Sequence, residues 1–131
     1  MALFSFGSNK SSINPLWVRM TVITDIDEAL NQSLSNPSII FKHSTRCSIS
    51  SMALNRFESS IDNIPIPCSF YFLDLLVYRN ISDEIANRLN VQHQSPQVIL
   101  LIKNEVIYTT SHGQIDANVI ANEIHNHANS N

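Results

Sequence analysis

Glycine is scarce in this chain, and no excess of positive charge is present. Only Gly7 and Gly113 occur among 131 residues, so the chain has no glycine-rich loop of the kind that binds phosphate groups. Eight Lys and Arg residues against eleven Asp and Glu leave a formal net charge of −3. Nucleic-acid binding usually needs an excess of Lys and Arg on one face. We therefore expect no nucleic-acid partner.

Long hydrophobic runs are also missing. No apolar stretch approaches the roughly 20 residues that are needed to cross a bilayer. Residues 1–12 have no cationic start before their short apolar stretch and no clear cleavage site, which argues against a signal peptide. We expect a flexible N-terminal tail over residues 1–14, one domain over residues 15–131, no membrane partner and a cytoplasmic location.

Cysteine occurs only twice, as Cys47 and Cys68. In a secreted protein an even number of cysteines suggests a disulfide, whereas without an export signal a reduced, reactive or buried thiol is expected. Cys68 follows Pro67 at the start of an apolar segment, where a packed thiol is favoured over a resolving one. The question is then whether Cys47 is reactive.

The spacing of apolar residues predicts alternating strands and helices. We expect strands at 17–21, 38–41, 70–73, 98–103 and 106–110, and helices from 24 or 25 to Asn36-Pro37, from close to Cys47, over about 82–89 and from about 116. Ile26, Leu30 and Leu34 should form the buried stripe of the first helix. A turn at Asn104-Glu105 should join the last two strands.

A helix between consecutive strands requires parallel pairing, while the final hairpin adds antiparallel strands. The predicted fold class is α/β, with a central mixed β-sheet flanked by helices on both faces. This is the arrangement of the thioredoxin fold.

Cys47 lies where a strand passes into a helix, and three features there favour its thiolate, the form that attacks disulfides. The N–H groups and dipole of the helix N-terminus favour negative charge. Arg46 and Lys42 supply nearby cations. Ser50, three residues on, can donate a hydrogen bond from the same helical face. The alternative is a buried, inert cysteine.

The segment Cys47-Ser48-Ile49-Ser50 is a C-x-x-C motif whose second sulfur is replaced by oxygen. A dithiol protein resolves its own mixed disulfide, but a monothiol must be released by an external thiol. We therefore expect a monothiol oxidoreductase.

A second indication comes from Ser95-Pro96, directly before the strand that begins at Gln97. In thioredoxin folds a cis proline at this junction lies against the reactive cysteine. The backbone of Ser95 would then pair with an extended substrate. An ordinary trans proline at a strand start is the alternative.

Several motifs in the right order resemble one family. They are Phe41-Lys42-His43-Ser44-Thr45-Arg46-Cys47-Ser48-Ile49-Ser50, Asp74 followed by Tyr78-Arg79, Ser95-Pro96-Gln97-Val98, and Ser111-His112. From about Trp17 to the final helix, the chain resembles the YtxJ-type monothiol bacilliredoxins. These are thioredoxin-like proteins associated with the low-molecular-weight thiol bacillithiol.

The resemblance implies an enzyme that reduces mixed disulfides between bacillithiol and protein cysteines, with Cys47 accepting the bacillithiol moiety. Bacillithiol would be a co-substrate, with no cofactor bound, and S-thiolated proteins would be partners of a monomer or weak dimer. Lys42 and Arg46 would pair with the carboxylates of bacillithiol, and His112 could line the groove, although a structural or surface role is the alternative. The chain departs from the family pattern at two positions, with Ser48 in place of proline and Gly113 in place of an aromatic residue. Both departures are expected to weaken ligand binding and to leave the thiol chemistry unchanged.

Other interpretations of the residues around Cys47 remain possible from the sequence. Cys47 could instead ligate an iron–sulfur cluster or belong to a non-catalytic thioredoxin-like binding module, although the C-G-F-S pattern of monothiol glutaredoxins is absent. Asp74 could transfer protons to and from Cys47, or it could form structural hydrogen bonds at the edge of the sheet. His125 and His127 do not share one helical face with each other, so no metal site is expected.

Overall fold

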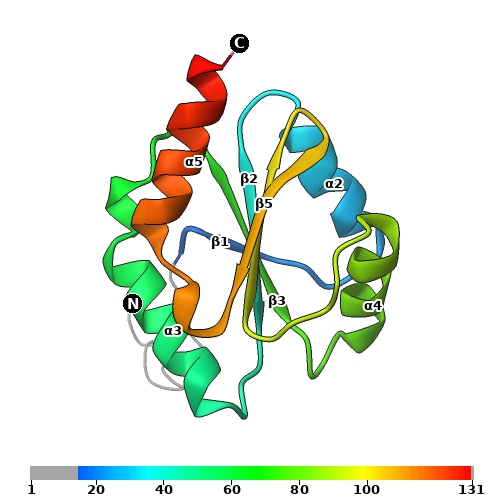
Figure 1. The fold of residues 1–131 in the computed structure, drawn as a ribbon. Coiled ribbons are helices and arrows are strands. Elements are labelled where there is room, and N and C mark those ends of the chain that lie inside the picture. The colour runs from blue at the N-terminus through cyan, green and yellow to red at the C-terminus, as the bar shows by residue number, and fades with distance from the viewer. Residues whose placement is uncertain (1–14, 131) are drawn as a thin grey trace, which may run out of the picture.

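Five strands and four α-helices make up residues 15–130, the part of the chain that the computed structural model describes (Figure 1). The strands are β1 (Trp17–Arg19), β2 (Ser38–His43), β3 (Ser69–Asp74), β4 (Gln97–Ile102) and β5 (Glu105–Ser111). The α-helices are α2 (Thr24–Gln32), α3 (Ser48–Ser59), α4 (Arg79–Arg88) and α5 (Ala117–Asn129), with short 3-10 helices η2 (Ile61–Asn63) and η3 (His112–Gln114). The tail expected over residues 1–14 lies outside the described residues.

The strands form one sheet in the order β1-β3-β2-β4-β5. β1 and β2 run parallel to β3, whereas β4 is antiparallel to both β2 and β5. The prediction of a mixed sheet is therefore confirmed. The parallel pairing places the C-terminal ends of β2 and β3 at the same edge of the sheet, which is the lower edge in Figure 1.

Helices cover both faces of the sheet, as predicted: α3 and α5 lie on one side and α2 and α4 on the other (Figure 1). Side chains alternate between the two faces along each strand and therefore contribute to two separate hydrophobic cores, one on each face of the sheet. The core under α3 is centred on Trp17, whose ring lies 5.8–5.9 Å, between centroids, from the rings of Phe41, Phe57, Phe70 and Phe72. This aromatic cluster fixes α3 against the sheet.

The structure corrects one expectation about the buried face of α2. The helix ends at Gln32, and Leu34, in the turn that follows, is half-exposed. Once the chain leaves the helix, the spacing of four residues no longer keeps a side chain on one face. Ile26 and Ala29 are the buried residues of α2.

The hairpin turn lies one residue earlier than predicted. Lys103 and Asn104 have φ angles of 54° and 68°, and Ile102 pairs directly with Glu105. Two consecutive left-handed residues between paired strands form a type I′ turn, whose twist matches that of the strands. Asparagine tolerates this conformation better than most residues, which explains its place in the turn.

Candidate functional site

Cys47 lies at the start of α3, in the connection that follows the C-terminal end of β2 (Figure 1). It is the N-cap residue of α3, with extended backbone angles (φ −113°, ψ 120°), and its carbonyl accepts the N–H of Ser51 at 3.1 Å. Its own N–H donates to the carbonyl of Ser44 at 3.2 Å. The predicted position at a helix N-terminus is confirmed, and the thiol is half-buried and not part of a disulfide.

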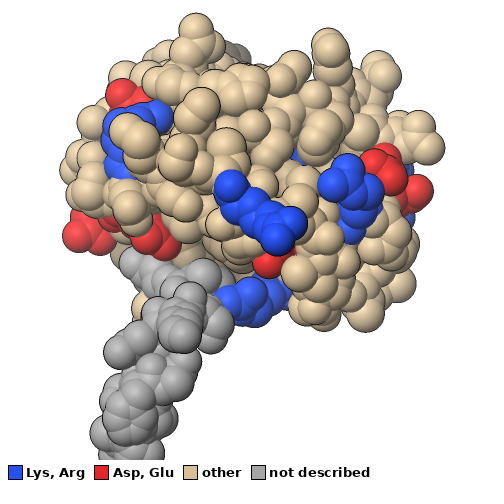
Figure 2. Space-filling model, turned by 90° about the horizontal axis from the view of Figure 1, so that it is seen from below, with Lys and Arg blue, Asp and Glu red and all other residues tan. Residues whose placement is uncertain are grey.

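Exposed apolar side chains lie near Cys47 in the chain and at the same edge of the sheet. Ile49 and Met52, in the first turns of α3, are 56% and 64% exposed. Leu76 and Val77, in the β3–α4 connection at the same edge of the sheet, are also exposed. Figure 2 views the molecule from this end and shows Lys and Arg side chains as separate groups on a largely uncharged surface.

Arg46 directly precedes Cys47, and its side chain is exposed. Residues 15–130 contain two ion pairs, Arg88 with Asp27 and Arg88 with Glu84, and Arg46 takes part in neither. The guanidinium therefore remains available to an anionic ligand at the surface beside Cys47.

Ser50 is fully buried, and its hydroxyl is engaged with the end of β2. Its Oγ accepts the N–H of Ser44 at 3.0 Å and lies 2.7 Å from Nδ1 of His43. No hydrogen bond to the sulfur of Cys47 is present among the described residues. The sequence predicted that Ser50 can donate to Cys47, and in the structure the same hydroxyl lies within hydrogen-bond distance of Nδ1 of His43.

Lys42 does not belong to the site. Its side chain is 0% exposed on the α4 face of the sheet, and its Nζ lies 2.7 Å from Nδ1 of His93. Burial lowers the pKa of Lys42 from 10.5 to about 8, against a smaller opposite effect of Asp83. The expectation that Lys42 meets the carboxylates of a substrate is therefore wrong. Side chains alternate along β2, so Lys42 points away from the side of the sheet on which α3 carries Cys47.

The predicted Ser95-Pro96 peptide bond is cis. Gln97, the first residue of β4, pairs with both Lys42 and Ser111, so Ser95, Pro96 and His112 lie at the same edge of the sheet as Cys47. His112 is exposed, and its N–H donates to the carbonyl of Pro96 at 3.1 Å. The hydroxyl of Ser95 is buried and has no hydrogen-bond partner among residues 15–130.

Arg56 links this edge to α3, a role that the sequence did not reveal. Its Nε donates to the carbonyl of Ile115 at 3.2 Å and its Nη2 to that of His112 at 3.5 Å. A basic residue in a helix gives no sign in the sequence that it will hold a distant loop. The position of His112 thus depends on α3 as well as on β5.

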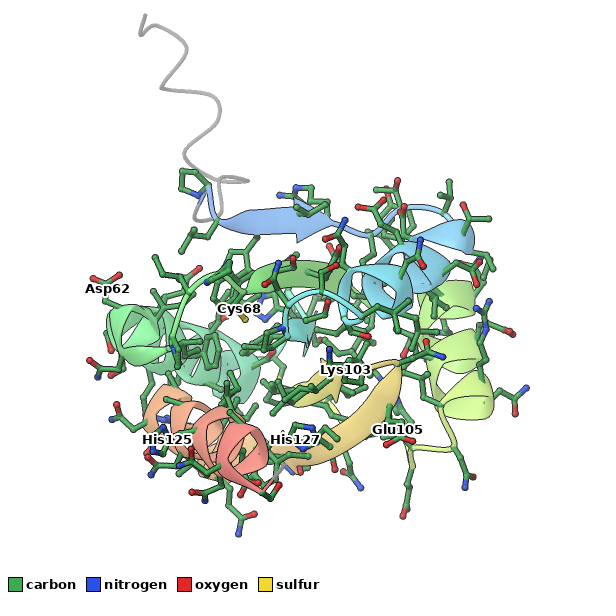
Figure 3. The ribbon with its side chains drawn as sticks, turned by 90° about the horizontal axis from the view of Figure 1, so that it is seen from above. Asp62, Cys68, Lys103, Glu105, His125 and His127 are labelled. Carbon is green, nitrogen blue, oxygen red and sulfur yellow. The ribbon has the colours of Figure 1, made fainter. Side chains whose placement is uncertain are left out.

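Cys68 lies at the opposite edge of the sheet, at the start of β3 (Figure 3). The six residues of β3 separate the two edges by about 20 Å, at about 3.3 Å per residue, whereas disulfide formation requires Cα atoms within about 7 Å. Burial raises the pKa of Cys68 to about 12. The packed thiol expected from the sequence agrees with this position, and a resolving role within one chain is excluded.

Asp74 ends β3 opposite His43 in the sheet register. Its Oδ1 accepts the N–H of Leu76 at 3.2 Å, the sheet-edge role that the sequence favoured. Its charge also acts on His43: burial lowers the pKa of His43, and Asp74 partly opposes that change.

Within residues 15–130, no group of three or more His, Cys, Asp or Glu side chains is placed to hold a metal ion. His125 contacts Asn129, its neighbour one turn further along α5, at 3.0 Å. In the same part of the chain, no helix combines the length and the apolar character that a membrane span requires.

Solved structures show which class of protein this fold defines. One similar structure, described as an oxidoreductase with a thioredoxin fold, is 25% identical, has a TM-score of 0.70 and covers 82% of this chain and 93% of its own. The thioredoxin of Fasciola hepatica is 14% identical with a TM-score of 0.61, covering 83% of this chain and 97% of its own. The thioredoxin of Schistosoma mansoni is 15% identical with a TM-score of 0.63, covering 82% and 97%. The chain thus has a thioredoxin fold, with a half-buried cysteine at the edge described above.

The family follows from the sequence itself. Residues 18–120 match the monothiol bacilliredoxin family, BrxC. The chain belongs to this family, as its motifs had indicated. Thiol redox chemistry follows from the family together with the fold.

Proposed function

We propose that the protein reduces mixed disulfides between bacillithiol and protein cysteines, with Cys47 as the nucleophile. The observation that carries the proposal is the position of Cys47: a half-buried, unpaired thiol at the N-cap of α3, three residues before a serine. The N-terminus of a helix favours the thiolate because its free N–H groups and dipole point at negative charge. Membership of the bacilliredoxin family supports bacillithiol as the co-substrate.

The exchange takes two steps. The Cys47 thiolate attacks the bacillithiol sulfur of the mixed disulfide, a new S–S bond forms, and the client cysteine leaves as a thiolate that takes a proton from water. A second low-molecular-weight thiolate then attacks the bacillithiol sulfur on Cys47. This step yields a small disulfide and restores the Cys47 thiolate, so the sulfur of the incoming thiol is oxidised in place of the client sulfur that is reduced. Ser50 has no sulfur with which to displace the adduct.

The residues around Cys47 suit this substrate. Bacillithiol carries carboxylates, and the exposed guanidinium of Arg46 is the cation next to the thiol. Ser95 and His112 lie at the same edge of the sheet and would contact the extended client segment or the bacillithiol moiety. The exposed side chains of Ile49 and Met52 would contact the client protein. This chemistry belongs to a reducing compartment, which agrees with the cytoplasmic location that we expected.

The test uses a client protein carrying a bacillithiol mixed disulfide, with release followed by mass spectrometry in the presence of free bacillithiol. We expect release by the wild type, none by Cys47→Ser and near-normal release by Cys68→Ser, which is the matched control. An Arg46→Gln variant should lose more rate on the bacillithiolated client than on one modified by an uncharged thiol. Full activity of Cys47→Ser would refute the proposal. A coloured cluster bound through Cys47 after anaerobic purification, without exchange activity, would favour the iron–sulfur carrier.

A further inference from the structure

His43, the last residue of β2, is a buried histidine whose side chain contacts the helix that carries Cys47. Its ring lies 5.5 Å from that of Phe72 and 6.3 Å from that of Phe41, between centroids. Only 6% of the residue is exposed. Among the described residues, its side chain makes a polar contact with Ser50, whose Oγ lies 2.7 Å from Nδ1. The His43 ring lies among aromatic side chains and contacts the Ser50 hydroxyl, so a change in the position of its ring hydrogen changes the hydrogen bonding of that hydroxyl.

The hydroxyl of Ser50 has one hydrogen to donate and two lone pairs that accept. The N–H of Ser44, at 3.0 Å, occupies one lone pair. If Nδ1 of His43 carries no hydrogen, Ser50 donates its hydrogen to the ring. If Nδ1 carries the hydrogen, it donates to the second lone pair of Ser50, and the hydroxyl hydrogen is free. The same heavy-atom positions therefore accommodate two opposite arrangements.

Cys47, three residues before Ser50, is a group that can accept a freed hydrogen. Cys47 is the N-cap of α3 and Ser50 its third helical residue, the spacing at which the two sulfurs of a C-x-x-C motif come close enough to form a disulfide. A thiolate is a much better acceptor than a thiol or a disulfide sulfur, because hydrogen bonds to charged groups are the stronger ones. The ionised state of Cys47 and the ring of His43 thus compete for one hydrogen.

We propose that His43 is a positioning residue that controls, through Ser50, whether Cys47 receives a hydrogen bond. With Cys47 as a thiolate, His43 carries its hydrogen on Nδ1 and Ser50 donates to the sulfur. With Cys47 in a mixed disulfide, His43 carries its hydrogen on Nε2 and Ser50 donates to Nδ1. This inference rests on the proposed role of Cys47: forming the thiolate requires His43 to change tautomer, whereas the mixed disulfide leaves Ser50 bonded to His43.

The charges around His43 allow both arrangements with a neutral ring. Burial lowers the pKa of His43 below its ordinary 6.5, and Asp74, its partner in β3, opposes this. On the β1 side, the guanidinium of Arg19 lies 5.6 Å from the centre of the Phe72 ring, which it shares as a neighbour with His43. The helix α3 contributes Ser50, and the loop before it contributes Arg46. At neutral pH the change is therefore one between two tautomers of an uncharged imidazole.

The direct test is long-range proton–nitrogen NMR of the histidine rings, because the two tautomers give different nitrogen shifts. The full chain with Cys68→Ser is compared at about pH 9.5, above the ordinary thiol pKa of about 8.5, with Cys47 free and with Cys47 blocked as a methyl disulfide. His43→Asn identifies the signal, and His125→Asn serves as the control. We expect Nδ1–H with free Cys47 and Nε2–H after blocking. The same tautomer in both states would overturn the proposal.

A double-variant cycle tests the route through Ser50. The readout is the pH at which alkylation of Cys47 by iodoacetamide reaches half its maximal rate. Ser50→Ala should raise this midpoint by about one pH unit, the size expected for losing a hydrogen bond to a charged group. His43→Leu should lower it, because Ser50 then has no competing acceptor, and the double variant should match Ser50→Ala. An equal effect of His43→Leu with and without Ser50 would refute the route.

One further variant and the choice of assays separate folding and function from this inference. His43→Asn, whose amide both donates and accepts, should restore a midpoint near that of the wild type if His43→Leu perturbs packing. Neither measurement uses bacillithiol, so the tautomer change can be established even if the bacillithiol exchange assay fails, and the reverse also holds.

Discussion

Replacing Lys42 by methionine should stabilise the protein at neutral pH. Lys42 is 0% exposed, and Nδ1 of His93, at 2.7 Å, contacts its amine. Burial lowers the pKa of Lys42 from 10.5 to about 8, and a change of about 2.5 pH units corresponds to about 3 kcal/mol at 1.36 kcal/mol per unit. Losing the hydrogen bond to His93 offsets about 1 kcal/mol of this. The expected net gain at pH 7 is therefore about 2 kcal/mol, or about 8 °C in Tm.

The effect of the substitution depends on pH because the folded and unfolded chains release the Lys42 proton at different pH values. Below pH 8 the amine is charged in both the folded and the unfolded chain, so the full cost of burying the charge is present. Between pH 8 and 10.5 the folded chain has lost the proton while the unfolded chain still holds it, and the cost falls as the pH rises. Above 10.5 the amine is neutral in both states. The advantage of the methionine variant should therefore shrink across this window.

The assay is urea unfolding of wild type and Lys42→Met at pH 7 and at about pH 10.5, in the presence of reductant. Comparing the two proteins at each pH cancels the contributions of other titrating groups. A variant less stable than the wild type at pH 7 would contradict the reasoning, and an equal gain at both pH values would assign the effect to packing instead of charge. Exchange activity should stay within about twofold of wild type, since Lys42 does not belong to the Cys47 site. A large loss of rate would show that Lys42 contributes to that site.

Three other predictions follow from the described contacts. Iodoacetamide at about pH 8 should label Cys47 in the folded protein and leave Cys68 unlabelled until urea is added, because burial raises the pKa of Cys68 to about 12; peptide mass spectrometry reads this, and equal labelling would contradict it. Phe57→Ala should cost about 3–5 kcal/mol in urea unfolding, since the ring is fully buried against Trp17; a loss below about 1 kcal/mol would mean that the cluster repacks. Asp116→Ala should cost about 1 kcal/mol, because the carboxylate caps α5 by accepting the N–H of Asn118 at 2.8 Å, and Asp116→Asn should restore most of that loss.

The order of strands and helices could be predicted from the sequence because hydrophobic periodicity is strong in each element. The boundaries were harder to place. The helix α4 begins at Arg79 instead of Ser82, because the first turn of a helix exposes polar residues that resemble a loop. The predicted turn after β4 was one residue too late because Lys103 adopts a left-handed backbone conformation, which is uncommon for lysine and is not indicated by the sequence.

At the site, Cys47 and Pro96 could be placed from the sequence, but the faces of β2 could not. The strand was expected to end at Phe41, yet it continues through Lys42 and His43. With the strand extended, its period of two puts Lys42 beside Ile40 and His43 beside Phe41, on opposite faces. Buried lysine is rare enough that polar residues after an apolar strand suggest a loop. For the same reason, the motif that contains His43 does not indicate a role for its side chain.

The separation of Cys47 and Cys68 by the length of β3 has a consequence for how long an adduct survives. No rearrangement short of unfolding brings the second sulfur within reach, so decay of the adduct is a bimolecular event whose rate follows the concentration of thiol in the surroundings. The fraction of molecules carrying an adduct would then track the oxidation state of the cellular thiol pool. The protein would report that state as well as act on it.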